Sequence, residues 1–536
     1  MSAQECAPEM GWHAAGSGGA VAAGGADAVS AGVGVLRGGG NAVDAAVATI
    51  LALSVTDYGL FAIGGEASFI LYNAARREVK VLCGLGSAPG SPEAVKWYLA
   101  NGIPAYGGIK AAPVPGAPDL CTTALRLYGT ISLEAAAAPA LCLLERGAEP
   151  WHASLARTIG RLVEAERQAS GGRERRLLAA RDRFYTGDIA GELEEFYASG
   201  GSFLRKADLA AHVARLEDPV SVRYRGYTVH KCGPWTQGPS LCQALRLLEG
   251  FDLKRMGHLS ADYVHVVVEA MKLALADRDE YYADPLFARV PLGGLLSDRY
   301  TDLRRGLIDL RRASTAIRPG DPYTPAALIR NPRQGGPSAG GTTTCVVADR
   351  WGNVVAATPS ANPPYAVCEA LGVAHGNRLR CLNVNPSHPN CIQPGKRPRI
   401  TLTPTLVVGD DGAVLAMSVA GGDLQDQTSL NCLLNHVEFG MMPREAVTAP
   451  RFGTAHHQNS FRPDADREQT VLARGSLTLD AKLGAALAQD LSERGHSVSR
   501  SEGPIACPVM LHLDAATGLA HVAGDPRAGR HAQALD

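Results

Sequence analysis

The sequence has 536 residues, enough for two ordinary domains or for one large domain built in several layers. Hydrophobic residues make up 46% and charged residues 20%, a globular composition that excludes a disordered or fibrous chain. With 52 basic and 53 acidic residues, the surface offers no long-range attraction to nucleic acid or to anionic lipid. We therefore expect a small-molecule partner, no nucleic acid and no membrane.

The twelve cysteines are scattered and lack the paired spacing of a zinc site. The densest cluster joins Cys381 and Cys391 to His375 and His388, but free thiols in a reducing cytoplasm are the simpler interpretation. The first residues lack the basic start and apolar run of a secretory signal, and no stretch approaches the ~18 apolar residues of a membrane span. The sequence thus predicts a cytoplasmic protein without a metal or another cofactor.

Apolar patterning predicts several helices and two strands in the first half of the chain. The predicted helices cover 28–36, a segment opening at Asn41, most of 118–170 and 263–279, and the predicted strands cover 68–72 and 223–231. Asn41 and Ser260 precede two of these helices, and both residue types cap helix N-termini because a side-chain oxygen accepts from the first free N–H groups.

A linker and a hairpin follow. Residues 313–340 carry five prolines and several glycines, which predicts a loop. The β-branched run 342–349, a turn at 350–353 and the apolar run 354–358 predict a hairpin that begins directly after two glycines. Beyond it, strands such as 402–408 and 415–419 alternate with helices such as 477–493.

A threonine at the start of a strand after two glycines suits one kind of catalysis. Its hydroxyl is a poor nucleophile, but its own α-amino group, with a pKa of roughly 7.7–8, can act as the base once the chain is cut before it. Small residues before Thr342 let its hydroxyl reach the preceding carbonyl, and Gly421 and Gly422 let backbone N–H groups approach a developing oxyanion. On spacing alone, a plain turn is the more frequent meaning of this pattern.

A phosphate-binding loop is the competing interpretation of the same segment. Residues 336–343 nearly fit the pattern GxxxxGK[ST], but Thr342 takes the place of the lysine and a strand follows in place of a helix. Neither the lysine nor a helix N-terminus is then available for phosphates, so we reject this interpretation.

Many segments in order resemble the gamma-glutamyltransferase family and its acylase relatives. They are LRGGGNAVDAAVA at 36–48, IGG at 63–65 with Ser68-Phe69, VPG at 114–116, FYTGDIA at 184–190, VEAMKLALADRD at 268–279, PGKRP at 394–398, Gly421-Gly422, APRF at 449–452 and GDPR at 524–527. The resemblance spans roughly residues 20 to 530, too many ordered motifs for chance.

The resemblance implies an α+β fold, a four-layer αββα sandwich of the N-terminal nucleophile hydrolase type. It also implies that the precursor cleaves itself between Gly341 and Thr342. The products would be a large subunit, 1–341, and a small subunit, 342–536, which stay together as a heterodimer. Thr342 would then form an acyl-enzyme that water or an amine resolves.

The resemblance also assigns residues around the nucleophile. The family's second hydroxyl, which orients the nucleophile, falls at Ser360, with Thr358 as the nearby alternative. The family's oxyanion donors fall at the backbone of Gly421 and Gly422.

The sequence departs from the family pattern at positions that bind the substrate in the family. The arginine that holds the glutamyl α-carboxylate in the family is absent from 85–89, and of two assisting serines only one hydroxyl remains, at Thr401. The asparagine that contacts the glutamyl amino group is kept, at Asn362. The alignment places Arg378 opposite another ammonium acceptor, where a cation cannot accept a hydrogen bond.

We therefore expect a small amide whose acyl group carries a carboxylate but lacks the glutamyl α-ammonium. Arg378, Arg397 and Arg399 are the candidate carboxylate partners, and Asp423 lies in an acylase-like segment and is a further candidate for substrate binding.

Three functions fit these observations. The first is a self-processing amide hydrolase or acyltransferase, the second a strict gamma-glutamyltransferase acting on glutathione-type substrates, and the third a family member that no longer catalyses. Intact Gly341 and Thr342 argue against the third, and the missing arginine argues against the second.

Overall fold

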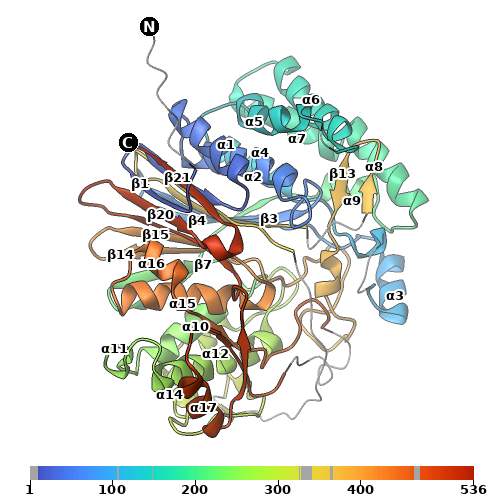
Figure 1. The fold of residues 1–536 in the computed structure, drawn as a ribbon. Helices are drawn as coiled ribbons and strands as arrows, with labels where there is room; N and C mark the ends of the chain where they lie inside the picture. Colours follow the sequence, from blue (N-terminus) through green and yellow to red (C-terminus); the bar gives the residue numbers. More distant parts are fainter. Residues whose placement is uncertain are drawn as a thin grey trace.

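The computed structural model of the chain describes residues 10–104, 108–147, 149–324, 326–327, 341–361, 366–463, 471 and 473–536. Two seven-stranded sheets form the centre of the molecule, and helices lie on the outer side of each sheet (Figure 1). The mixed helix and sheet fold predicted from the sequence is confirmed.

The first sheet has the order β21-β2-β10-β11-β3-β4-β5, and its neighbours all run antiparallel. Its strands are β2 (Gly19–Ala23), β3 (Glu66–Asn73), β4 (Glu78–Gly84), β5 (Arg215–Glu217), β10 (Cys345–Asp349), β11 (Val354–Ser360) and β21 (His531–Leu535). The hairpin predicted after the linker is confirmed as β10 and β11, and it lies in the middle of this sheet.

The second sheet has the order β1-β20-β19-β15-β14-β7-β6. Its strands are β1 (His13–Gly16), β6 (Val220–Tyr224), β7 (Tyr227–Lys231), β14 (Thr405–Gly409), β15 (Val414–Ala420), β19 (Cys507–Leu513) and β20 (Ala520–Gly524). The single strand expected over 223–231 is wrong, because Arg225 (φ 49°) and Gly226 (φ 84°) make a tight turn that splits it into a hairpin.

Side chains of the central strands alternate between two cores. Val346 and Ala348 of β10 face the second sheet and pack in the core between the two sheets. Cys345 and Val347 of the same strand point the other way, into the core beneath the helices. This period of two explains why residues 345–348 of β10 are all apolar, since both faces of the strand are buried.

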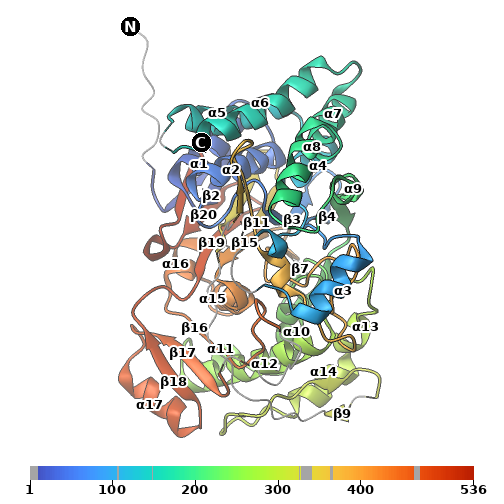
Figure 2. The same cartoon turned by 90° about the vertical axis from the view of Figure 1, so that its right-hand side faces the viewer.

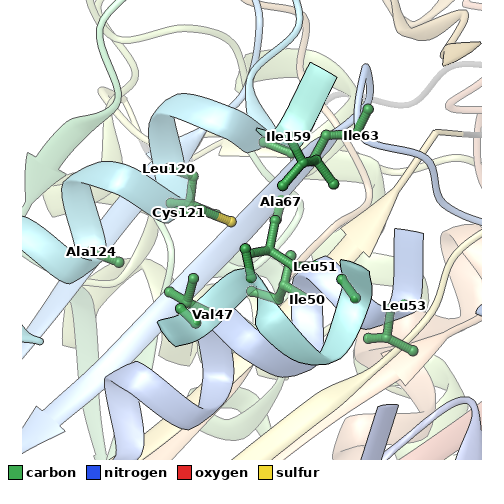
Figure 3. Packing of buried hydrophobic residues seen from close by; sticks show 14 of the residues in the cluster. Val47, Ile50, Leu51, Leu53, Ile63, Ala67, Leu120, Cys121, Ala124 and Ile159 are labelled. Carbon is green, nitrogen blue, oxygen red and sulfur yellow. The ribbon is translucent and has the colours of Figure 1, made fainter. Parts of the chain in front are cut away.

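Helices cover the outer face of each sheet. Over the first sheet lie α1 (Ala26–Arg37), α2 (Ala42–Thr56), α4 (Ala117–Tyr128), α5 (Leu133–Glu145), α6 (His152–Gln168), α7 (Arg173–Tyr185) and α8 (Asp188–Ser199). Over the second lie α10 (Pro239–Leu248), α12 (Ala261–Tyr281) and α15 (Gln425–Val437). The apolar side chains of α2, including Val47, Ile50 and Leu51, pack among those of α4 and β3 (Figure 3).

The predicted caps are confirmed. The side chain of Asn41 accepts from the backbone N–H groups of Val43 and Asp44, and Asp44 closes a capping box. Ser260 accepts from the backbone N–H of Tyr263 and begins α12.

The remaining elements lie around these layers. They are α3 (Pro92–Asn101), α9 (Lys206–Ala211), α11 (Leu253–Met256), α13 (Leu292–Leu295), α14 (Asp298–Arg305), α16 (Pro443–Thr448), α17 (Ala485–Glu493), β8 (Gly320–Asp321), β9 (Ala326–Ala327), β12 (Ala366–Cys368), β13 (Val373–His375), β16 (Phe452–Gly453), β17 (Ser476–Asp480) and β18 (Ser497–Ser501). Figure 2 places α5 to α8 at one end of the molecule and β17, β18 and α17 at the other.

The helix expected over 477–493 is wrong in its first part. Leu477 and Leu479 are buried while Thr478 between them is not, so this stretch follows the period of a strand and forms β17. The helix begins only at Ala485.

Residues before and after the Gly341–Thr342 bond are interleaved in both sheets. In the first sheet, β10 from the later part lies between β2 from the earlier part and β11 from the later part. In the second sheet, β14 from the later part pairs with β7 from the earlier part. Neither part therefore forms a complete sheet by itself.

Within the described part of the chain, no helix combines the length and the apolar character needed to cross a membrane. The described cysteines are all free thiols. The cytoplasmic location stays a prediction.

Candidate active site

Thr342 lies in a short segment without regular secondary structure just before β10 and is buried. Its neighbours in sequence are held by the two flanking strands. The backbone N–H of Thr343 donates to the Pro359 carbonyl of β11 (2.9 Å), and the Gly24 N–H beyond β2 donates to the Thr344 carbonyl (3.3 Å). The sheet therefore fixes the backbone around the predicted nucleophile.

Two hydroxyls meet at the carbonyl oxygen of Gly341, the predicted point of cleavage. Thr342 Oγ1 donates to this oxygen at 2.8 Å, and Ser360 Oγ donates to it at 2.5 Å. Thr358, the alternative second hydroxyl, instead pairs with Ser418 Oγ (2.9 Å) of the facing sheet. Of the two candidates, the structure brings only Ser360 to the predicted cleavage point.

Arg378 approaches the same place from a short 3₁₀ helix over Arg378–Cys381. Its Nη2 donates to Ser360 Oγ and its Nε donates to Glu66 Oε1, both at 2.7 Å. Burial disfavours the charged guanidinium, but the Glu66 carboxylate outweighs this and raises the pKa of Arg378. Two of the nitrogens of Arg378 thus already have protein partners in this structure, which the sequence did not indicate.

Gly421 and Gly422 directly follow β15, as predicted. Gly422 has φ 59°, and a Cβ there would lie 2.9 Å from the ring of Phe461, so only glycine fits without strain. The guanidinium of Arg378 lies 5.7 Å from the centre of the same ring. Phe461 therefore connects the glycine turn to the residues around Gly341, while the oxyanion role of the turn stays a prediction.

Asp423 lies in a buried ionic network behind this turn. It accepts from Arg278 Nη1 at 2.6 Å and from the hydroxyl of Ser460. Burial opposes the charged form of Asp423, but Arg278, followed by His457 and Arg399, outweighs it and lowers the pKa of Asp423 to about 2. The carboxylate is thus engaged with protein groups.

Arg399 belongs to the same network. Its Nη1 donates to Ser460 Oγ at 2.7 Å, and its Nη2 is 3.9 Å from Asp279 Oδ1. Burial, together with the like charge of Arg278, lowers the pKa of Arg399 to about 10. Arg399 is therefore a buried cation that a bound anion would stabilise.

The other predicted substrate residues differ in their surroundings. Arg397 donates to Asp284 through Nε and Nη2 and to Glu217 through Nη1, so two carboxylates already neutralise it. We therefore do not retain Arg397 as a substrate partner. Thr401 is buried, and its hydroxyl has no hydrogen-bond partner among the described residues. Asn362 lies outside the described residues.

A cavity of about 270 Å³ opens beside Phe461. Its lining residues are Asn101, Gly102, Ile103, Arg380, Leu382, Asn383, Val384, Phe461, Arg462 and Pro463. The guanidinium of Arg380 lies 5.0 Å from the centre of the Phe461 ring, on which Arg378 also lies. Two arginines and no acidic side chain among these lining residues make the cavity suited to an anion.

Sequence reasoning missed Glu66, Arg380 and Phe461. A signal existed for Glu66, because a carboxylate that opens the apolar strand 66–71 needs a buried partner. No comparable signal marks Phe461, since its importance comes only from the side chains that meet it in space.

A threonine hydroxyl and a serine hydroxyl thus meet at one peptide carbonyl shortly before a central strand, an arrangement compatible with cleavage before an N-terminal nucleophile. The model of the gamma-glutamyltranspeptidase family matches residues 28–167 and 153–535. The chain belongs to this family. It is accordingly an enzyme of the family's class, an amide hydrolase or acyltransferase with a threonine nucleophile.

Named relatives agree with this assignment. The Acylase ACY 1 proenzyme of Pseudomonas sp. (strain SE83) is 32% identical over 91% of this chain and 88% of its own length. The glutathione hydrolase proenzyme of Bacillus subtilis (strain 168) is 30% identical over 82% of this chain and 81% of its own length. The crystal structure of cephalosporin acylase from Bacillus halodurans superposes with a TM-score of 0.80, at 26% identity, and covers 100% of this chain and 99% of that one.

Proposed function

We propose that this chain is a self-processing amidohydrolase that cleaves itself between Gly341 and Thr342 and then acts on a small amide through an acyl-Thr342 intermediate. The observation that supports this most directly is the pair of hydroxyl hydrogen bonds on the Gly341 carbonyl. Two donors on one carbonyl oxygen polarise the bond that must be attacked. Cleavage releases the α-amine of Thr342, which then serves as the base.

The cleaved protein is proposed to be a four-layer αββα sandwich shared by two subunits, 1–341 and 342–536. The interleaving of strands from both parts in each sheet supports this arrangement. Separating the subunits would break backbone hydrogen bonds in the middle of both sheets, such as those between β2 and β10.

The acyl group is proposed to carry a negative charge and to lack a neighbouring ammonium. Arg380 and Arg462 line the cavity beside Phe461, and Arg399 is a buried cation near the glycine turn. Guanidinium groups bind carboxylates through charge-assisted hydrogen bonds. They would repel the α-ammonium of a glutamyl group. We propose that Thr401 contributes a hydroxyl, that Asp423 holds Arg278 and Arg399 in place, and that the Gly421 and Gly422 N–H groups stabilise the oxyanion.

Two measurements test this function. Denaturing mass spectrometry of the purified chain and of Thr342→Ala should give two fragments, the second beginning at Thr342, for the wild type and one uncut chain for the variant. A single uncut chain in both would favour a non-catalytic protein.

The substrate class is tested with three anilides of matched length. They carry a glutaryl group, a γ-glutamyl group or an uncharged acyl group. We expect the glutaryl anilide to give the highest kcat/KM. Faster turnover of the γ-glutamyl anilide or of glutathione would instead support a strict gamma-glutamyltransferase, the activity class of the Bacillus subtilis relative.

A further inference from the structure

Glu66 and Ser360 stand directly opposite each other on the paired strands β3 and β11. Side chains of directly paired residues lie on the same face of a sheet. Arg378 bridges them, because its Nε donates to Glu66 and its Nη2 donates to Ser360, each at 2.7 Å. All three side chains are fully buried, so no water competes for these bonds.

The bridge fixes the direction in which the Ser360 hydroxyl donates. A guanidinium has only donors, so Ser360 Oγ must accept from Arg378 with a lone pair. The hydroxyl hydrogen is then free to point at the Gly341 carbonyl oxygen, 2.5 Å from Ser360 Oγ. Each hydrogen bond in such a chain polarises the next.

We propose that Arg378, held in place by Glu66, is a positioning residue for self-cleavage that keeps the Ser360 hydroxyl donating to the Gly341 carbonyl. This inference rests on the proposed cleavage before Thr342. It assigns to Arg378 a role in processing the precursor, in place of the substrate role expected from the sequence.

The chemistry shows where this arrangement acts. Thr342 Oγ1 forms a bond to the carbonyl carbon of Gly341, and the carbonyl oxygen becomes negatively charged. The C–N bond to Thr342 then breaks, the hydroxyl proton passes to the released amine, and an ester links Gly341 to the Thr342 side chain. Water hydrolyses this ester to a Gly341 carboxylate and a free hydroxyl. The hydrogen bond from Ser360 strengthens as the oxygen becomes charged, so it lowers the barrier.

The test follows cleavage in time during cell-free synthesis of the full chain, with the cut fraction read by denaturing mass spectrometry. We expect Ser360→Ala to slow cleavage by about 100-fold, as for the loss of an oxyanion donor. Ser360→Thr, which keeps the hydroxyl, should stay within about threefold of the wild type, since the donor to the same oxygen is retained.

Arg378 is best removed together with its counter-ion, because a lone buried charge destabilises the fold. The neutral pair Glu66→Gln/Arg378→Met should slow cleavage at least about tenfold in the Ser360 background, because the hydroxyl loses its orientation. In the Ser360→Ala background, the same pair should add less than about a twofold effect, since residues that act through one group are not additive.

Arg451→Lys is the matched control for Arg378→Lys, because it also keeps the charge of a buried, ion-paired arginine and removes its fork. Arg451 is buried to a similar degree and pairs with Asp525, and its other hydrogen bonds go to the carbonyls of Val447, Ile505 and Ala506. We expect this variant to lower stability and leave the cleavage rate unchanged. Should the neutral pair fail to fold, Arg378→Lys decides, because a lysine keeps the charge but lacks the fork that reaches both partners. It should also cleave more slowly.

The outcomes separate the two proposals. An uncut wild-type chain would overturn both. A wild type that cuts, with a neutral pair or Arg378→Lys variant that cuts equally fast, would overturn this inference alone. Equal slowing by the neutral pair with and without Ser360 would also overturn it, since Arg378 would then act only through stability.

Discussion

The hydroxyl of Thr343 donates to the carboxylate of Asp57 at 2.5 Å, so the residue after the proposed nucleophile Thr342 is attached to the C-terminal end of α2. The backbone N–H of Thr343 is fastened as well, to Pro359 of β11. Two independent contacts thus set the direction in which the chain leaves Thr342, one from a helix and one from the sheet.

Loss of the Thr343 hydroxyl should loosen this attachment. Thr343→Val keeps the shape but leaves the Asp57 carboxylate without this donor, at a cost of about 1–3 kcal/mol in the free energy of unfolding. Urea unfolding of the uncut Thr342→Ala precursor, with and without Thr343→Val, measures this. Thr448→Val is the control, because the Thr448 hydroxyl only donates to its own helix backbone. Equal losses in both variants would contradict the special role of the Thr343 contact.

Gly24 makes the same attachment possible by its lack of a side chain. A Cβ at Gly24 would lie 2.1 Å from Asp57 Oδ2 and 2.3 Å from Thr343 Oγ1, so Gly24→Ala must push both aside. We expect this variant to cleave at least about tenfold more slowly, because displacement of a reacting group by about 1 Å is known to cost up to 100-fold.

Gly34 provides the comparison for Gly24. It lies within α1, and no atom lies within 4 Å of a Cβ built there. Gly34→Ala should raise the free energy of unfolding by about 0.5–1 kcal/mol through helix propensity and leave cleavage unchanged. If Gly24→Ala cleaved at the wild-type rate, the packing around Thr343 would not control the nucleophile.

Acidic pH should destabilise the fold through His375. This side chain is fully buried against the hydroxyl of Tyr197 (2.9 Å), and burial lowers its pKa from 6.5 to about 4. The unfolded chain therefore binds the proton more tightly, so stability is complete above about pH 6.5 and is lost as the pH falls toward about 4.

The effect of His375 amounts to about 2 kcal/mol of unfolding free energy between about pH 7 and about pH 5. Urea midpoints of the wild type and of His375→Gln at both pH values measure it. Other buried histidines lower the stability of both proteins alike, so only the difference is diagnostic. The same pH dependence in both proteins would show that His375 is not responsible.

Arg380 should affect anionic substrates selectively. It lines the cavity beside Phe461, and Arg380→Gln removes the charge there. We expect kcat/KM for a glutaryl anilide to fall about tenfold or more, through KM, because a hydrogen bond to a charged group contributes about 1.5–3 kcal/mol. Turnover of an uncharged acyl anilide should hardly change. Arg223→Gln, which breaks an exposed pair with Asp410 and an exposed hydrogen bond to Thr228, is the control. An equal loss with both anilides would place the acyl group elsewhere.

Local signals in the sequence predicted local structure well. Asn41, Ser260 and the hairpin after the linker were predicted because each depends on residues that are neighbours in the chain. The structure also brings Gly341, Thr342 and Ser360 together, while the roles that the family resemblance implies for them stay predictions. The strand at 476–480 was missed because its apolar period changes within a few residues of a true helix.

The partners of the buried charged side chains could not be predicted from the sequence. Arg378 and Arg397 looked alike as candidate carboxylate partners, yet Arg397 is neutralised by Asp284 and Glu217. Arg378 contacts both Glu66 and Ser360 because the pairing of β3 with β11 places those two residues opposite each other. Such partners are far apart in the chain, and one sequence without pairing information does not reveal them.

The edge strand of the first sheet sets an order of events during synthesis. β2 pairs with β21 on one side and with β10 on the other. A strand from the start of the chain therefore lies between two strands that are translated much later. The segment around Thr342 emerges before β21 exists. The sheet that holds the segment around Thr342 is therefore complete only after β21 has been translated.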